Sequence, residues 1–299
     1  MNARLLPLLM LFPCLSAQDP KPPAKPPAAE QPQQPAKTEQ QVLDELKQQL
    51  QKEGIVFDTK AQTVAVPAVV NHPQDPIEYL LINKKGKRHE AVFITKCKPS
   101  VLNGALLLLG MTPGKNAQFT EKNPPPTLEE VQKGADPIVV TPPQGMPFWM
   151  TVRWKSPEGE AVEHCIEDMV LDLGTQQALA ECSWIYLGGR MAQLYRNEPE
   201  VYVADFEGNL ISICYLSPDN HLATMVHKNA RDDQNWWTTT LLPPPDTEVE
   251  FVFHKVQPAL HVERHKRLEK AAADAKGKDG EGKHKETPKQ PAPGSQPGK

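Results

Sequence analysis

The chain has 299 residues, of which 39% are hydrophobic and 6% are aromatic, and its formal net charge is −4. Residues 261–299 hold ten Lys/Arg and six Asp/Glu, which leaves 23 and 31 for the rest, a body with a net charge of −8. An acidic body lacks the basic face that phosphate backbones require, so nucleic acid is excluded as a partner.

The N-terminus resembles an export signal. Arg4 precedes the apolar run Leu5–Phe12, and the small residues Ser16 and Ala17 follow. This order predicts a secretory signal peptide over residues 1–17, and the apolar run is too short to span a bilayer. No later segment is long and apolar enough to be transmembrane, so we expect a periplasmic or extracellular protein. Lipid attachment at Cys14 is the alternative.

A proline-rich stretch and a helix come next. Residues 18–37 contain seven prolines, which predicts a disordered linker. Over residues 38–53, Val42, Leu43 and Leu46 recur with Leu50 at helical spacing, and Gly54 gives a stop signal. We therefore expect an amphipathic helix that docks on the domain that follows.

The sequence predicts one β-rich globular domain over residues 54–258. Strands are expected where apolar residues alternate or run together between turn signals, and helices where Pro99–Ser100 and Thr127 supply starts. The fold class is α+β, mainly antiparallel, with two or three short helices and disordered termini, including a disordered charged tail over 266–299. The expected strands are 63–70, 78–83, 89–95 and 249–256, with hairpins over 148–167 and 201–216 and a buried helix over 101–109.

Several segments are similar to the YdjY-domain family of exported bacterial proteins. The resemblance rests on Gly86–Phe93, Lys98–Ser100 and Ala105–Gly110, together with Ala204–Ile211 and the run from Trp236 to Pro245. The resemblance covers about Gly54 to Val256. It implies a secreted domain and carries no catalytic residues over to this chain.

Four cysteines follow the predicted signal: Cys97, Cys165, Cys182 and Cys214. In an oxidising compartment they are disulfide candidates, with three pairings open, and buried free thiols are the alternative. Some relatives carry a ferredoxin-like label. The spacings here of 68, 17 and 32 residues contain no Cys-x-x-Cys to hold an iron–sulfur cluster, and no cofactor is predicted.

Two residue doublets are candidate ligand sites. His89–Glu90 is a weak metal candidate, but neighbours on a strand point to opposite faces, which favours a structural role. Trp236–Trp237 suggests a stacking platform, although one ring in the core and one at the rim is the commoner arrangement.

Other histidines have simpler interpretations. His164 shares strand parity with apolar residues and is expected in the core, on the opposite face from Cys165. His221 and His227 are interpreted as solvated. His261 and His265, four residues apart on a possible helix, could bind metal adventitiously.

The sequence contains no catalytic motif, which favours a non-catalytic extracytoplasmic module that binds an unidentified envelope or secreted protein. The alternative is a metal- or redox-linked secreted enzyme that uses His89, Glu90 or the cysteines.

Overall fold

The computed structural model describes residues 38–180 and 182–281. The predicted signal peptide and linker, residues 1–37, lie outside this part, as does the end of the predicted tail, residues 282–299. The described helices are α1 Glu39–Lys52, η1 Arg88–Glu90 (3-10), α2 Pro99–Leu108, α3 Leu128–Gln132, η2 Ile166–Met169 (3-10), α4 Val203–Glu207 and α5 Ala259–Glu281.

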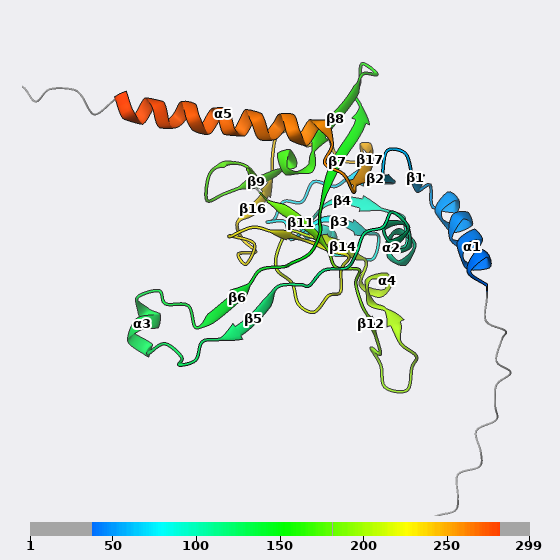
Figure 1. Ribbon diagram of the computed structural model, residues 1–299, viewed down its shortest axis with the longest axis horizontal. Coiled ribbons are helices and arrows are strands. Elements are labelled where there is room, and N and C mark those ends of the chain that lie inside the picture. Colours follow the sequence, from blue (N-terminus) through cyan, green and yellow to red (C-terminus); the bar gives the residue numbers. More distant parts are fainter. Residues whose placement is uncertain (1–37, 181, 282–299) are drawn as a thin grey trace, which may run out of the picture. The chain divides into compact units, whose positions relative to one another are not determined.

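Eight strands close into a barrel, because the last strand of the sheet path, β4, pairs back onto β2 (Figure 1). Six of the eight pairings are antiparallel, and β14–β15 and β3–β4 are parallel. The predicted mainly antiparallel β architecture is confirmed, whereas closure of the sheet was not predicted. In order around the barrel the strands are β2 Thr63–Val70, β17 Glu248–His254, β7 Pro147–Lys155, β11 Ser183–Tyr186, β15 Ala223–Val226, β14 Asn209–Ser212, β3 Tyr79–Asn83 and β4 Ala91–Thr95.

The core fills the barrel, and along β17 alternate residues enter it. The centroid of the Phe251 ring lies 5.7 Å from that of Phe93 and 5.2 Å from that of Phe253, which stacks on Phe148. The intervening residues of β17, such as Glu248 and Glu250, point outward. This period of two in the sequence is therefore what sets the inner and outer faces of the barrel.

The remaining strands lie beside the barrel or form small sheets. β1 Val56–Asp58 pairs with the first half of β2, and β8 Ala161–Cys165 pairs with the last half of β7. The predicted hairpin over 148–167 is confirmed as β7–β8. The small sheets contain β10 Gln177–Ala178, β9 Val170–Asp172 and β16 Trp236–Thr238; β12 Met191–Ala192 and β13 Val201–Tyr202; and β5 Gln118–Glu121 and β6 Ile138–Thr141.

The predicted helix over 38–53 is confirmed as α1, and it docks as expected. Gly54, at φ +70°, follows it, and Leu50 is buried in the core. Leu46 lies against Gly104 of α2, where a Cβ atom would come within 3.0 Å of its Cδ1. Glycine at this position therefore lets the two helices approach closely. The capping box predicted at Thr127 is also present.

The two or three short helices predicted for residues 54–258 correspond to α2, α3 and α4. Two other expectations were wrong. The expected hairpin over 201–216 is instead helix α4, capped by Gly208 at φ +81°, followed by β14, which pairs with β3 and β15. The expected all-round burial of α2 is incomplete, because Leu107 and Leu108 are 47% and 43% exposed.

The tail departs most from the prediction. Residues 266–281 were expected to be disordered, but α5 continues through them to Glu281. Between Pro258 and Pro288 the chain has no proline and is rich in Ala, Lys, Glu and Arg, all strong helix formers. The mixed charge that suggested disorder is equally compatible with a solvated helix face. Among the described helices, none is sufficiently long and apolar to cross a membrane.

Candidate functional site

His89 and Glu90 do not lie on a strand as predicted, but on the 3-10 turn η1 that precedes β4. Their side chains meet there, with His89 Nε2 3.1 Å from Glu90 Oε1, so the alternation argument fails for this pair. Lys87 Nζ bridges Glu90 and Glu78 at 3.0 Å each. His89 is 67% exposed, and Lys87 already forms an ion pair with each of the two carboxylates. The arrangement is that of a surface ion-pair network.

His164 and Cys165 lie on opposite faces of β8, as expected. Instead of entering the core, the His164 ring is half-buried and stacks on Trp154, with centroids 5.5 Å apart. Cys165 is fully buried, and burial raises the pKa of its thiol to about 12. This thiol is therefore protonated at neutral pH, which opposes a role as a free nucleophile.

The solvated interpretation of His221 and His227 was wrong. His221 is buried, and burial lowers its pKa to about 4. His227 packs edge-on against Trp236, with ring centroids 5.3 Å apart. Trp236 itself lies in the core and Trp237 is half-buried, so the two rings do not form an exposed stacking platform.

The disulfide expectation also needs correction, because all four cysteines in the described part are free thiols. Cys97 lies between β4 and α2, and its Sγ donates to the carbonyl oxygen of Glu53 at 3.4 Å. Cys165 and Cys182 instead lie near Glu167 on η2. The alternative of buried thiols therefore holds for Cys97, Cys165 and Cys214, and Cys182 is half-buried.

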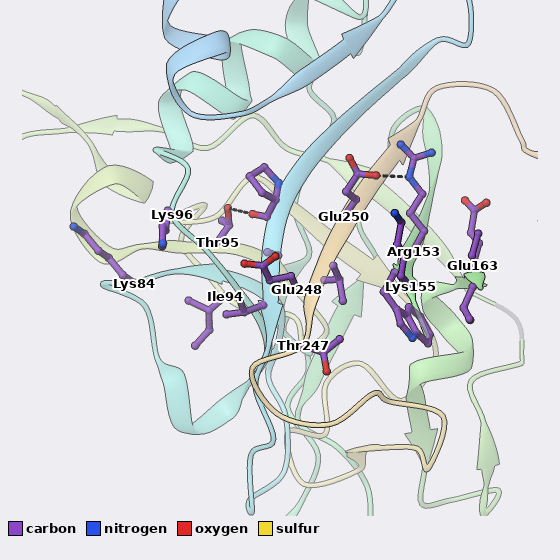
Figure 2. Close-up of a pocket in the computed structure, with 17 residues that line it drawn as sticks. Lys84, Ile94, Thr95, Lys96, Arg153, Lys155, Glu163, Thr247, Glu248 and Glu250 are labelled. Carbon is purple, nitrogen blue, oxygen red and sulfur yellow. Dashed lines mark hydrogen bonds and ion pairs between the residues drawn. The ribbon is translucent and has the colours of Figure 1, made fainter. Parts of the chain in front are cut away.

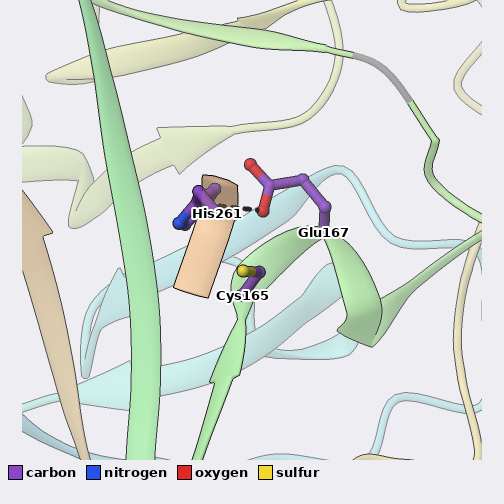
Figure 3. A group of neighbouring side chains, drawn as sticks. All are labelled: Cys165, Glu167 and His261. Atoms are coloured by element: carbon purple, nitrogen blue, oxygen red, sulfur yellow. Dashed lines mark hydrogen bonds and ion pairs between the residues drawn. The ribbon is translucent and has the colours of Figure 1, made fainter. Parts of the chain in front are cut away.

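Sequence reasoning missed a buried cluster formed by Cys165, Glu167 and His261 (Figure 3). The cluster lies where the end of β8, the turn η2 and the first turn of α5 meet. One potential ligand atom from each residue lies within 4.8 Å of the other two, and all three residues are buried. His261 Nε2 is 3.1 Å from Glu167 Oε2.

The helix α5 brings His261 to the barrel because one of its faces is bound there. Arg264, three residues further on, is 7% exposed, and its Nε donates to Asp168 Oδ1 at 2.7 Å. Its other nitrogens donate to the carbonyl oxygens of Leu179 and Ala180. The spacing of His261, Arg264 and half-buried Leu268 is the one signal that could have identified this face from the sequence.

The Glu167 carboxylate is held from two sides. Trp184 Nε1 donates to its Oε1 at 2.8 Å, and His261 approaches the other oxygen. Burial alone would raise the pKa of Glu167, but the hydrogen bond and charge of His261 outweigh it and hold the pKa below its ordinary value. Glu167 is thus an ionised, oriented carboxylate in the interior.

Two further polar features adjoin the cluster. Glu163 and His254 both hydrogen-bond to Thr151 Oγ1, at 2.7 and 2.9 Å. Burial lowers the pKa of His254 to about 4, so its ring is neutral. On the other side, a cavity of about 350 Å³ is lined by Glu167, Cys182 and His261 among others.

A larger groove crosses the outer surface of β4, β2, β17 and the β7–β8 hairpin, with a volume of about 1320 Å³. Figure 2 shows Lys84 and Lys96 at one end of it and Lys155 and Glu163 at the other. Its apolar lining comprises Pro67, Ala68, Val69, Ile94, Trp154, Ala161, Val162 and Val249.

The charges around this groove are only partly paired. Arg153 Nε donates to Glu250 Oε2 at 2.6 Å across the middle. Lys84, Lys96 and Glu248 form no ion pair with any residue in 38–180 or 182–281. The groove therefore combines apolar surface with side-chain charges that are available to a ligand.

Comparison with known proteins identifies the family of the chain. No curated protein and no solved structure matches the chain. The family model of the YdjY domain matches residues 55–254, which spans the whole barrel and ends before α5. The chain therefore belongs to the YdjY-domain family.

Proposed function

We propose that the chain is an exported, non-catalytic binding module whose groove receives an extended peptide segment of an envelope or secreted protein. Export is supported by Arg4, the apolar run Leu5–Phe12 and the small residues after it. The observation that carries the binding role is the 1320 Å³ groove with an apolar lining and unpaired charges. Apolar pockets with a few well-placed polar groups are the usual form of ligand sites.

The dimensions of the groove suit a short extended peptide. Its lining comes from five neighbouring strands, β4, β2, β17, β7 and β8, and thus crosses four inter-strand spacings. At about 4.8 Å per spacing the groove spans roughly 19 Å, the length of about six residues in extended conformation. Crossing the strands, such a segment would be held by side-chain contacts instead of joining the sheet as a further strand.

Charge complementarity defines the preferred peptide. Lys84 and Lys96 at one end would attract an acidic side chain or a terminal carboxylate. Pro67, Val69 and Ile94 between them and the centre offer contact to apolar side chains, and unpaired Glu248 would attract a basic one. We therefore expect an apolar segment with an acidic residue at one end and a basic residue near its middle.

A random six-residue peptide library displayed on phage tests this proposal. After selection on the full-length chain, the enriched peptides are titrated by fluorescence anisotropy. We expect Lys96→Glu to weaken binding by at least about tenfold, which corresponds to roughly 1.4 kcal/mol, whereas Lys133→Glu, at the exposed residue directly after α3 and outside the groove, leaves it unchanged. The proposal fails if no acidic-ended apolar sequence is enriched, or if enriched peptides bind both variants equally.

A second candidate function is a metal-linked role, favoured by one specific observation, the convergence of Cys165, Glu167 and His261. The alternative function predicted from the sequence was a metal- or redox-linked enzyme that uses His89, Glu90 or the cysteines. This cluster contains a cysteine but neither His89 nor Glu90. Its distinguishing feature is that it requires α5, whereas none of the residues that line the groove lies on α5.

A further inference from the structure

We propose that Cys165, Glu167 and His261 form a zinc site that fastens helix α5 to the barrel, with its fourth position facing the cavity beside Cys182. This site is separate from the groove, with which it shares no residue. Each ligand comes from a different element, β8, η2 and α5, so a bound ion would join the barrel to the helix that follows it.

The chemistry of the donors selects the metal. A thiolate, an imidazole and a carboxylate together are a typical set for Zn²⁺, which binds sulfur, nitrogen and oxygen ligands with four-fold coordination. Ca²⁺ and Mg²⁺ take oxygen ligands almost only, so Cys165 and His261 exclude them. Binding of zinc would release the proton of the buried Cys165 thiol, and the ion would then balance the charge of the thiolate.

The distances fit after a small contraction. Bonds of about 2.0–2.3 Å to zinc place tetrahedral ligand atoms roughly 3.3–3.8 Å apart. His261 Nε2 and Glu167 Oε2, at 3.1 Å, are already at about this separation. The full set lies within 4.8 Å, so an inward movement of about 1 Å by the ends of the side chains would form the site.

The surroundings of the cluster suit a cation. All three residues are buried, and His261 is only 7% exposed, so little solvent competes for an ion there. The nitrogen of His261 that faces Glu167 is Nε2, so Nε2 would bind the ion. Trp184 already holds the Glu167 carboxylate in position, which is how hydrogen bonds behind metal ligands usually act.

Two ligands are available for the fourth position. The 350 Å³ cavity is large enough for water, and Cys182 lines it with its Sγ 3.9 Å from Glu167 Oε1. A water would leave the ion open to exogenous ligands, as in catalytic sites, whereas Cys182 would close it as in structural sites.

The test is metal binding by the full-length chain. After incubation with equimolar ZnSO₄ and gel filtration, we expect about one zinc ion per chain by atomic emission, and a sulfur-to-metal charge-transfer band when Co²⁺ replaces zinc. Cys165→Ser and His261→Ala should each lower zinc affinity by at least about tenfold. His89→Ala, an exposed histidine on η1 that lines neither the cluster nor its cavity, and Cys214→Ser, a buried cysteine elsewhere, are matched controls that should bind normally.

The outcomes separate the proposal from its alternatives. Full zinc binding by Cys165→Ser, or no bound zinc in the wild-type chain, would overturn it and leave His261 and Glu167 as a hydrogen-bonded pair. The wild-type cobalt band decides the matter even if a variant fails to fold, because a site without a thiolate produces none. Cys182→Ser identifies the fourth ligand: loss of affinity assigns the position to Cys182, and retained affinity assigns it to water.

Discussion

Replacing Arg264 by alanine should detach α5 from the barrel. Arg264 is 7% exposed and donates to Asp168 and to the carbonyl oxygens of Leu179 and Ala180. Removing one partner of a buried ion pair typically costs about 3–5 kcal/mol, because the other charge is left uncompensated. The Asp168 side chain is 18% exposed and retains some hydration, so we expect the lower end, about 3 kcal/mol.

The assay is urea unfolding followed by circular dichroism, with thermal melting alongside. For a domain of this size each kcal/mol lowers Tm by about 2–4 °C, so Arg264→Ala should lower it by roughly 6–12 °C. Arg267→Ala, an exposed arginine on the same helix, is the matched control and should stay within about 0.5 kcal/mol of the wild type. If the two variants are equally stable, the contacts of Arg264 do not hold α5 and the reasoning is refuted.

Three further predictions test the interior. Burial lowers the pKa of the His221 ring to about 4. Below pH 6.5 this histidine is therefore protonated in the unfolded chain but still neutral in the folded chain. The contribution of His221 to the free energy of unfolding is complete above pH 6.5 and falls by roughly 3 kcal/mol towards pH 4. His221→Leu should reduce that slope in urea titrations across pH 4–7.5 to the part due to His254, whose pKa burial also lowers to about 4, and an unchanged slope would assign all of it to other groups. Gly208→Ala should destabilise by more than about 1 kcal/mol in thermal melts, because Gly208 has φ +81° and a Cβ atom would lie 2.5 Å from Gly86 N; a neutral effect would contradict this turn. The Cys214 thiol should resist a maleimide label, detected by mass spectrometry, until urea unfolds the chain, and a thiol that stays unlabelled in urea would indicate a disulfide.

The sequence predictions that the structure confirms rest on local patterns. Alternation over Thr63–Val70 and around Trp154 gave the strands β2 and β7, and the pair Thr127–Glu130 gave the start of α3. Each of these signals is contained within a few neighbouring residues. The parallel pairing of β3 with β4 and the pairing of β4 with β2 depend on contacts between separate segments of the chain. Closure of the barrel therefore has no signal in the local sequence.

The candidate sites show the same contrast between what neighbouring residues indicate and what contacts between distant segments determine. His89–Glu90 attracted attention because its residues are neighbours, yet a 3-10 turn set their geometry where a strand was expected. Cys165 and Glu167 lie 94 or more residues before His261, and only packing of α5 brings the three together. Mixed charge along residues 266–281 concealed this helix, because charged residues that form strong helices also occur in disordered tails.

The family boundary at residue 254 falls before α5, and this has a consequence for the unit that folds. A chain ending there would keep Glu167 and Asp168 but lose the imidazole and guanidinium that face them. The two carboxylates would then either be exposed to solvent or stay buried without a counter-charge. The barrel surface that α5 covers would be exposed as well. We therefore expect the smallest unit that folds on its own to be the barrel together with the first turns of the helix that follows it.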